Sequence, residues 1–333
     1  RYRDWVTMNI AGEFQRVYTF PVQTLANGGE RVVLRDGLGS NVVSFSYDDA
    51  RHWPIEADGA GHSLVPRVVS DQADGVLNYG ANWRASAFID GSPGEADPEP
   101  VRDLLINELV AHTDLSDPAY PDHDSNDAIE LYNTTGAAVT LTDWYLSDEA
   151  GVLAKGALPV THVNEALGWL WFDEVTGFHN PISSGFGLDK AGEQVFLSHL
   201  PGGGSNRVVD AVRFKGQANG EAWGRYGDGQ GYWYTLEPTP KAANAAPGAH
   251  VLLSENLYHP APTAANPENN TNDEYIEIYN PLGSDVPLWT EAGPWRIDGG
   301  VKYTFASNTT LAAGGYLVLV SFDPEVDAAA REG

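Results

Sequence analysis

Residues 128–133, Ala-Ile-Glu-Leu-Tyr-Asn, give the clearest indication of the fold of this chain. They form a short apolar and alternating run that aspartate precedes and Thr-Thr-Gly follows, which is the pattern of a strand between two turns. The 36 glycines and 21 prolines are spread along the chain, as many short turns require. Long patterns of period 3.6 are missing, so we expect an all-β sandwich with a helix only at 323–331. Further strands are predicted at 104–110, 194–197, 208–212 and 316–320.

The same stretch occurs a second time. Tyr275-Ile276-Glu277-Ile278-Tyr279-Asn280 repeats the pattern of residues 128–133 at an offset of 147 residues. Internal similarity at a fixed offset indicates homologous structural units. The offset also relates, in or close to register, 105–108 to 252–255 and 167–172 to 314–319.

The later part of this unit has its second copy at the start of the chain. Residues 29–34, Gly-Glu-Arg-Val-Val-Leu, match 192–197, and Ser-Pro-Gly at 92–94 falls opposite Thr-Pro-Lys at 239–241. Linker-like sequence follows 92–94 and 239–241, at 94–100 and 242–248. We therefore divide the chain into the back half of one unit at 1–96, a complete unit at 101–246 and the front half of a third at 250–333.

Two explanations for the partial units are open. Either the sequence is a piece of a longer tandem array, or a front half in one chain completes a back half in another. A sandwich that lacks strands exposes edges, and exposed edges pair with other strands. The second explanation predicts that the chain associates with copies of itself by strand complementation.

These motifs together resemble the bacterial lamin tail domain. The complete unit carries Leu-Ile-Asn-Glu at 105–108, an acidic loop, residues 129–133, and then Val-Thr-Leu-Thr-Asp-Trp-Tyr-Leu-Ser-Asp at 139–148. The third unit repeats the pattern at 275–280 and 311–320. The first unit carries the downstream motifs at 27–36, 82–84 and 92–94.

The resemblance implies tandem immunoglobulin-like sandwiches. Such units occur in large secreted or cell-surface proteins of bacteria, beside hydrolase, CotH-kinase-like or adhesive modules. Residues 253–260 are similar to the opening of units that accompany CotH-type proteins. The expected partners are therefore neighbouring domains of a larger parent protein, and the resemblance gives this chain no kinase activity.

The charge argues against nucleic acid as a partner. The chain holds 19 Lys and Arg against 46 Asp and Glu, a net charge of −27, whereas phosphate binding needs basic surface. Anionic membranes are disfavoured for the same reason. The longest apolar run towards the C-terminus, 316–320, is far shorter than the ~20 residues that cross a bilayer, so no membrane insertion is expected. Cysteine is absent, which removes disulfides and thiol nucleophiles.

The acidic loop before residue 128 is a candidate calcium site. Carboxylate and amide oxygens at nearly alternate positions can converge on Ca²⁺, which takes six to eight oxygen ligands. The loop lacks the central glycine of an EF-hand, and the matching loop at 269–274 has lost the early carboxylates. The alternative is a solvated loop of turn-forming residues. The candidate ligands are Asp122, Asp124, Asn126, Asp127 and Glu130.

Aromatic residues gather between 221 and 234, in a glycine-rich stretch. Exposed flat rings beside carboxylates can stack on sugars, as in a polysaccharide-binding module. The alternative is that they pack onto the sandwich, as we expect of Trp144 and Trp169 in their strand-like runs. The candidate carbohydrate ligands are Trp223, Tyr226, Tyr232, Trp233 and Tyr234.

Glu130 and Glu277 occupy matching strands, and their recurrence in two units favours a structural role over acid–base catalysis. Accepting backbone N–H bonds from a loop is such a role. None of the nine histidines has the spacing of a zinc motif, and no G-x-S-x-G elbow occurs. We therefore expect a non-enzymatic extracellular or cell-surface array segment that spaces, adheres or positions its neighbours. The alternative is an accessory carbohydrate-binding module of a secreted hydrolase.

Overall fold

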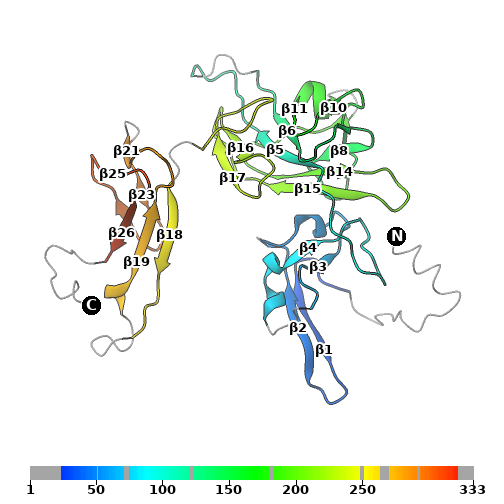
Figure 1. Cartoon of the computed structure of the whole chain (residues 1–333), viewed down its shortest axis with the longest axis horizontal. Helices are drawn as coiled ribbons and strands as arrows, with labels where there is room; N and C mark the ends of the chain where they lie inside the picture. Colours follow the sequence, from blue (N-terminus) through cyan, green and yellow to red (C-terminus); the bar gives the residue numbers. More distant parts are fainter. Residues whose placement is uncertain are drawn as a thin grey trace. The chain divides into compact units, whose positions relative to one another are not determined.

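A computed structural model describes residues 24–50, 52–70, 75–119, 124–180, 184–247, 251–262, 270–290 and 293–321. The protein is nearly all β (Figure 1), which confirms the predicted fold class. It divides into two compact units, one up to Ala246 and one from Pro247 onward. The helix predicted at 323–331 and the candidate ligand Asp122 lie outside the described residues.

The two largest sheets of the first unit are antiparallel and form a sandwich. All five strands predicted from the sequence are present in the structure, four in this unit and 316–320 in the second, with ends that differ by two residues at most. The larger sheet has the order β11 (Trp169–Asp173), β6 (Ala128–Asn133), β5 (Leu104–Val110), β16 (Ala222–Arg225) and β17 (Trp233–Leu236). The smaller sheet has the order β15 (Arg207–Arg213), β14 (Gln194–His199), β8 (Trp144–Ser147) and β9 (Gly156–Ala157).

An apolar core fills the space between the two sheets. Ile129 and Leu131 of β6 belong to it and are fully buried, because successive residues of a strand point to opposite faces and these two share one. β5 contributes Leu104, Ile106 and Leu109 to the core, and the spacing of three between the last two does not fit simple alternation. A β-bulge between Ile106 and Glu108 shifts the register and makes this possible. Each such side chain stabilises the fold by roughly 1.5–3 kcal/mol.

The two tryptophans expected in the core differ in position. Trp144 is 2% exposed and lies in the core, as predicted. Trp169 is only half-buried, and its ring lies 5.6 Å from that of Tyr132. That prediction was wrong because the core side of β11 is occupied by Leu170 and Phe172, which alternate with Trp169.

The remaining elements of the sandwich are β7 (Val139–Thr140) with β10 (Val163–Asn164), β12 (His179–Asn180) with β13 (Ser184–Gly185), and one π-helical turn, η4 (Glu174–Phe178).

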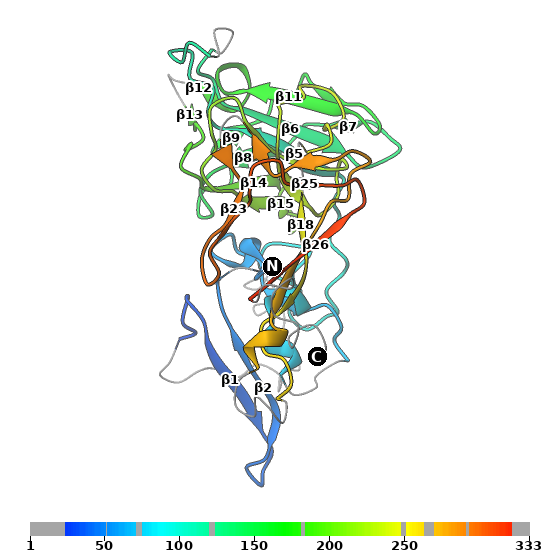
Figure 2. The same ribbon diagram turned by 90° about the vertical axis from the view of Figure 1, so that its left-hand side faces the viewer.

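The residues before the sandwich pack on the outer face of its smaller sheet. Ala60 contacts Phe196 and Val208 in a small buried cluster on that face. The Ile89 N–H also donates to the Asn206 carbonyl at 2.9 Å. A hairpin of β1 and β2 extends from this segment (Figure 2). The elements are β1 (Glu30–Arg35) with β2 (Asn41–Tyr47), β3 (Leu64–Pro66) with β4 (Trp83–Ala85), and the 3₁₀ turns η1 (Ile55–Ala57), η2 (Val76–Asn78) and η3 (Gly80–Asn82).

The second unit repeats part of the larger sheet. Its strands β18 (Leu252–Leu257), β19 (Tyr275–Tyr279) and β26 (Tyr316–Val320) pair in the order that β5, β6 and β11 have in the first unit. Leu288 and Leu311 lie in its core. In the described parts of both units, no helix is long and apolar enough to cross a bilayer. Its short elements are β20 (Val286–Pro287) with β25 (Thr310–Leu311), β21 (Trp289–Thr290) with β22 (Gly293–Pro294), β23 (Arg296–Ile297) with β24 (Tyr303–Thr304), and η5 (Thr271–Asp273).

Candidate functional site

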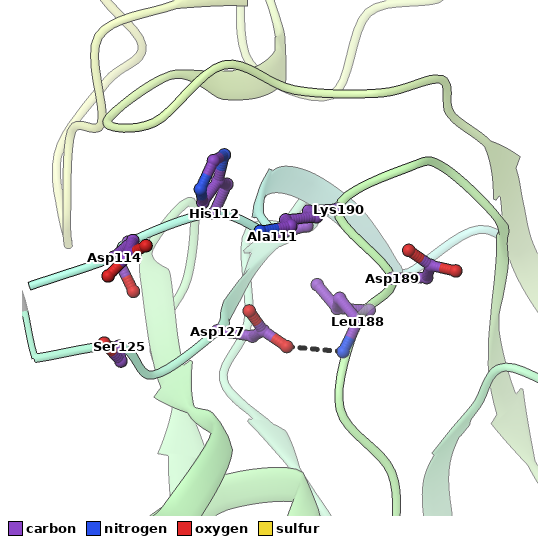
Figure 3. Close-up of a pocket in the computed structure, with 9 residues that line it drawn as sticks. Ala111, His112, Asp114, Ser125, Asp127, Leu188, Asp189 and Lys190 are labelled. Carbon is purple, nitrogen blue, oxygen red and sulfur yellow. Dashed lines mark hydrogen bonds between the residues drawn. The ribbon is translucent and has the colours of Figure 1, made fainter. Parts of the chain in front are cut away.

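The acidic loop joins β5 to β6 and borders an open pocket of about 350 Å³. One wall of this pocket is the segment 111–114, which carries His112 and Asp114. The opposite wall is the segment 188–190, and the Asp127 carboxylate lies between the two walls (Figure 3). The loop therefore contributes two half-buried carboxylates, those of Asp114 and Asp127, to one cavity.

Asp127 accepts hydrogen bonds through both its side chain and its backbone. Its Oδ2 accepts the Leu188 N–H at 2.5 Å, and its backbone carbonyl accepts the Glu174 N–H at 2.7 Å. Burial raises the pKa of Asp127 to about 6, and the nearby Glu174 carboxylate also acts to raise it. The Leu188 N–H and His179 oppose this rise. Burial thus holds the pKa of Asp127 above the usual range of an aspartate.

The other candidate calcium ligands that the structure describes have hydrogen-bond partners of their own. The Asp124 carboxylate accepts the backbone N–H of Asn126 at 3.0 Å and its side-chain amide at 3.1 Å, which closes a local turn. Glu130 is fully buried and accepts hydrogen bonds from Lys241 and Asn107. Among the described residues, no three His, Asp or Glu side chains are grouped to hold a metal ion. Since Asp122 is outside the described residues, the calcium site stays a prediction.

The structural role expected of Glu130 is present in the structure. Its Oε2 accepts the backbone N–H of Lys241 at 2.6 Å. Lys241 belongs to residues 237–246, a segment after β17 that we call the strap. The strap contributes hydrogen bonds to the outer face of the larger sheet, opposite the face that meets the core. In the second unit, Glu277 accepts the Ser254 hydroxyl at 2.8 Å.

Sequence reasoning missed a second buried acid beside Glu130. Glu108 of β5 is the direct cross-strand partner of Glu130, and both are 0% exposed. Glu108 accepts the Thr239 N–H of the strap at 3.0 Å. Burial raises the pKa of both acids, that of Glu130 to about 8, and Asp228 adds to the rise in each case. The recurrence of Asn-Glu at 107–108 as Ser-Glu at 254–255 was the available signal.

A buried ion pair links the larger sheet to the smaller one. Arg225 of β16 is 4% exposed and donates to both carboxylate oxygens of Asp210, at 2.9 and 3.2 Å. It also donates to the Ile106 carbonyl at 2.8 Å. Arg102 reaches Asp210 from the surface at 2.5 Å. A buried arginine with these partners fixes β15 against β5 and β16.

The aromatic cluster divides into packed and exposed rings. Trp223 and Trp233 stack at 6.4 Å with an angle of 12° between their planes, and both pack against the main core. The Arg225 guanidinium lies 4.5 Å from the Trp233 ring centre. Tyr226 and Tyr232 are 45% and 74% exposed. Tyr234 packs against a small cluster on the outer face.

We compared the chain with protein-family models, with curated proteins and with solved structures, and none of these comparisons gave a match.

Proposed function

We propose that this chain is a non-catalytic segment of an extracellular or cell-surface array, which holds neighbouring domains at fixed positions. Two features of the sequence support this: tandem repeated units and a net charge of −27, which keeps an extended surface hydrated. The resemblance to the lamin tail domain points the same way.

The observation that carries the proposal is the attachment of the segment before the sandwich, residues 52–70 and 75–100, to the smaller sheet. We call this attachment the joint. An array positions its neighbours only if successive repeats are joined by fixed contacts. Here the joint includes the buried Ala60, Phe196 and Val208. It also includes His62, which is 6% exposed and accepts the Val208 N–H at 2.9 Å. Buried apolar and directional polar contacts together resist rotation at such a joint.

Distance measurement between two spin labels tests this function. The chain has no cysteine, so the double variant Tyr79→Cys/Ala166→Cys places one label on each side of the joint. Both positions are exposed, and neither belongs to the cluster at the joint. We expect one narrow distance distribution for the full chain in solution. A distribution as broad as that of a flexible linker contradicts a positioning role.

A matched pair of variants controls this measurement. Ala60→Glu places a charge in the buried joint and should broaden the distribution, since an unpaired buried charge is strongly unfavourable. Ala96→Glu makes the same change at an exposed position and should leave the distribution unchanged. If both variants behave alike, the cluster around Ala60 does not hold the joint.

Tyr226 and Tyr232 support a second candidate, an accessory carbohydrate-binding module. They lie in the connection between β16 and β17 and are the exposed rings of the aromatic cluster. Retention on insoluble polysaccharides tests this candidate with Tyr232→Ala and Tyr226→Ala. Trp233 is a poorer probe because its replacement also removes core packing and the Arg225 contact. Equal retention of the wild type and both tyrosine variants contradicts the module.

A further inference from the structure

Two acids lie side by side beneath the strap, and in the described part of the chain neither forms an ion pair. Glu108 and Glu130 are paired across β5 and β6 and are both fully buried. Two carboxylates in such a position repel each other, and burial disfavours the charged form of each. The hydrogen bonds around them indicate how the structure accommodates the pair.

The side-chain amide of Asn244 sets the direction of these bonds. Asn244 is a buried strap residue whose Nδ2 donates to the carbonyls of Asn107 and Arg225, at 3.1 and 2.8 Å. The reverse orientation would place the amide oxygen against two carbonyl oxygens. Asn244 Oδ1 therefore faces the Thr239 hydroxyl, 2.7 Å away, and has to accept its hydrogen.

The Thr239 hydroxyl has only one hydrogen, and it has two close neighbours. Besides Asn244 Oδ1, the Glu108 Oε2 lies 2.7 Å from the Thr239 Oγ1. Since the hydroxyl hydrogen goes to Asn244, the contact with Glu108 is a hydrogen bond only if Glu108 supplies the proton. The resulting chain runs from Glu108 O–H to the Thr239 hydroxyl and on to the Asn244 amide oxygen.

We propose that Glu108 is a carboxylic acid in the folded protein at neutral pH, and that its ionisation releases the strap from the sheet. The ionised form would direct two acceptors at one Thr239 hydrogen and place a charge beside the buried Glu130 carboxyl. The strap leads directly into Pro247, where the second unit begins. Alkaline release therefore lengthens the free connection between the two units.

The groups around the pair favour the neutral acid. Asp228, from the connection between β16 and β17, accepts N–H bonds from Asn107 and Asn244 and repels both glutamates. Arg225 of β16 is engaged by Asp210. Lys241 of the strap is exposed and offers Glu130 its backbone N–H. β11 and β17 contribute Trp171 and Tyr234 to the same face.

Glu108→Gln is the decisive variant because glutamine reproduces the protonated acid. Its oxygen can accept the Thr239 N–H, and its amide N–H can donate to the Thr239 hydroxyl. We expect full-length E108Q to fold with at least wild-type stability at pH 7. The infrared band of protonated carboxylic acid at pH 7 should weaken in E108Q relative to the wild type. The variant Glu130→Gln is measured in parallel. If the band keeps its intensity in E108Q, or weakens only in E130Q, the proton is not on Glu108.

Trypsin cleavage after Lys241 reports release of the strap. At each pH we compare the rate of cleavage at this bond in the wild-type chain with the rate in E108Q. We expect the ratio of the wild-type rate to the E108Q rate to rise at least tenfold between pH 7 and pH 9.5. Comparison at equal pH removes the pH dependence of the protease. Glu237→Gln changes an exposed strap residue in the same way and should behave as the wild type. Equal cleavage of the wild type and E108Q across this range contradicts the release.

Discussion

Asn133 and Asn280 occupy equivalent positions in the two units, 147 residues apart, and both are fully buried. Each is the last residue of the repeated run, and each backbone N–H donates to a glycine carbonyl, that of Gly168 or Gly315, at 3.0 Å. The side-chain amides also have equivalent partners. Asn133 donates to the carbonyls of Ala137, Asn164 and Glu165, and Asn280 to those of Ser284, Leu311 and Ala312.

Replacing either asparagine by alanine should destabilise its own unit by about 1–3 kcal/mol, because buried carbonyls lose their donors. Urea denaturation followed by residue-resolved NMR measures each unit separately. Asn280→Ala should lower the midpoint of the second unit and leave the first unchanged, and Asn133→Ala should do the opposite. Asn256→Ala removes an exposed amide and serves as the control. Wild-type midpoints in both buried variants would contradict this role.

Acid should loosen the joint between residues 52–100 and the sandwich through His62. Its Nε2 accepts the Val208 N–H, so its Nδ1 carries the hydrogen that binds the Ser86 carbonyl at 2.7 Å. Burial lowers the pKa of His62 below the usual 6.5. A lowered pKa means that the stabilisation is present above pH 6.5 and is lost as pH falls through the folded-state pKa.

Thermal unfolding between pH 7.5 and 4.5 measures this loss. We expect the wild-type melting temperature to fall more steeply towards acid than that of His62→Gln. His259→Gln, which changes a more exposed histidine of the second unit, should keep the wild-type slope. Parallel curves for the wild type and His62→Gln would exclude His62 as the titrating group.

Asp127→Asn should stabilise the protein at pH 7. The pKa of Asp127 is raised from 3.8 to about 6, so its contribution to stability is present below pH 3.8 and is lost as pH rises through 6. Asparagine stays neutral and can still accept the Leu188 N–H. We expect a gain of roughly 1–2 kcal/mol at pH 7 and none at pH 4, by chemical denaturation. The exposed Asp124→Asn is the control, and a gain of equal size at both pH values would refute the explanation.

Calcium should bind the acidic loop weakly, because the Asp124 carboxylate must exchange its bonds to Asn126 for the ion. Isothermal calorimetry on the full chain is expected to give a heat of binding, with a rise in melting temperature. Both effects should disappear in Asp122→Asn/Asp124→Asn and should be absent with Mg²⁺. If the wild type gives neither heat nor a thermal shift, the loop is only a solvated turn.

The sequence predicted the strands well because short apolar runs between turn residues are local signals. It also predicted the Glu130 bond to a loop, because the glutamate recurs in matching strands. The pairing of Glu108 with Glu130 was not accessible, since it depends on the β-bulge after Ile106. The strap has no periodic pattern at all. Its position depends on tertiary contacts through Thr239 and Asn244, which no local rule predicts.

Gly224→Ala tests how closely the strap must approach the sheet. A Cβ at Gly224 would lie 2.8 Å from Leu236 Cδ1 and 2.9 Å from Asn244 Nδ2, inside normal contact distance. Asn244 is held by two carbonyls and cannot move without losing them. Overpacking of this kind typically costs about 1–3 kcal/mol. We therefore expect lower stability and faster tryptic cleavage after Lys241 in this variant at neutral pH.

Gly216→Ala is the matched control for this prediction. Its added Cβ would meet only carbonyl atoms at 3.5 Å or more, which is ordinary contact, and its backbone does not require glycine. Stability and cleavage after Lys241 should then equal those of the wild type within error. Were Gly224→Ala also to match the wild type, Asn244 would have moved freely. In that case the hydrogen-bond chain through Thr239 would not be what holds the strap.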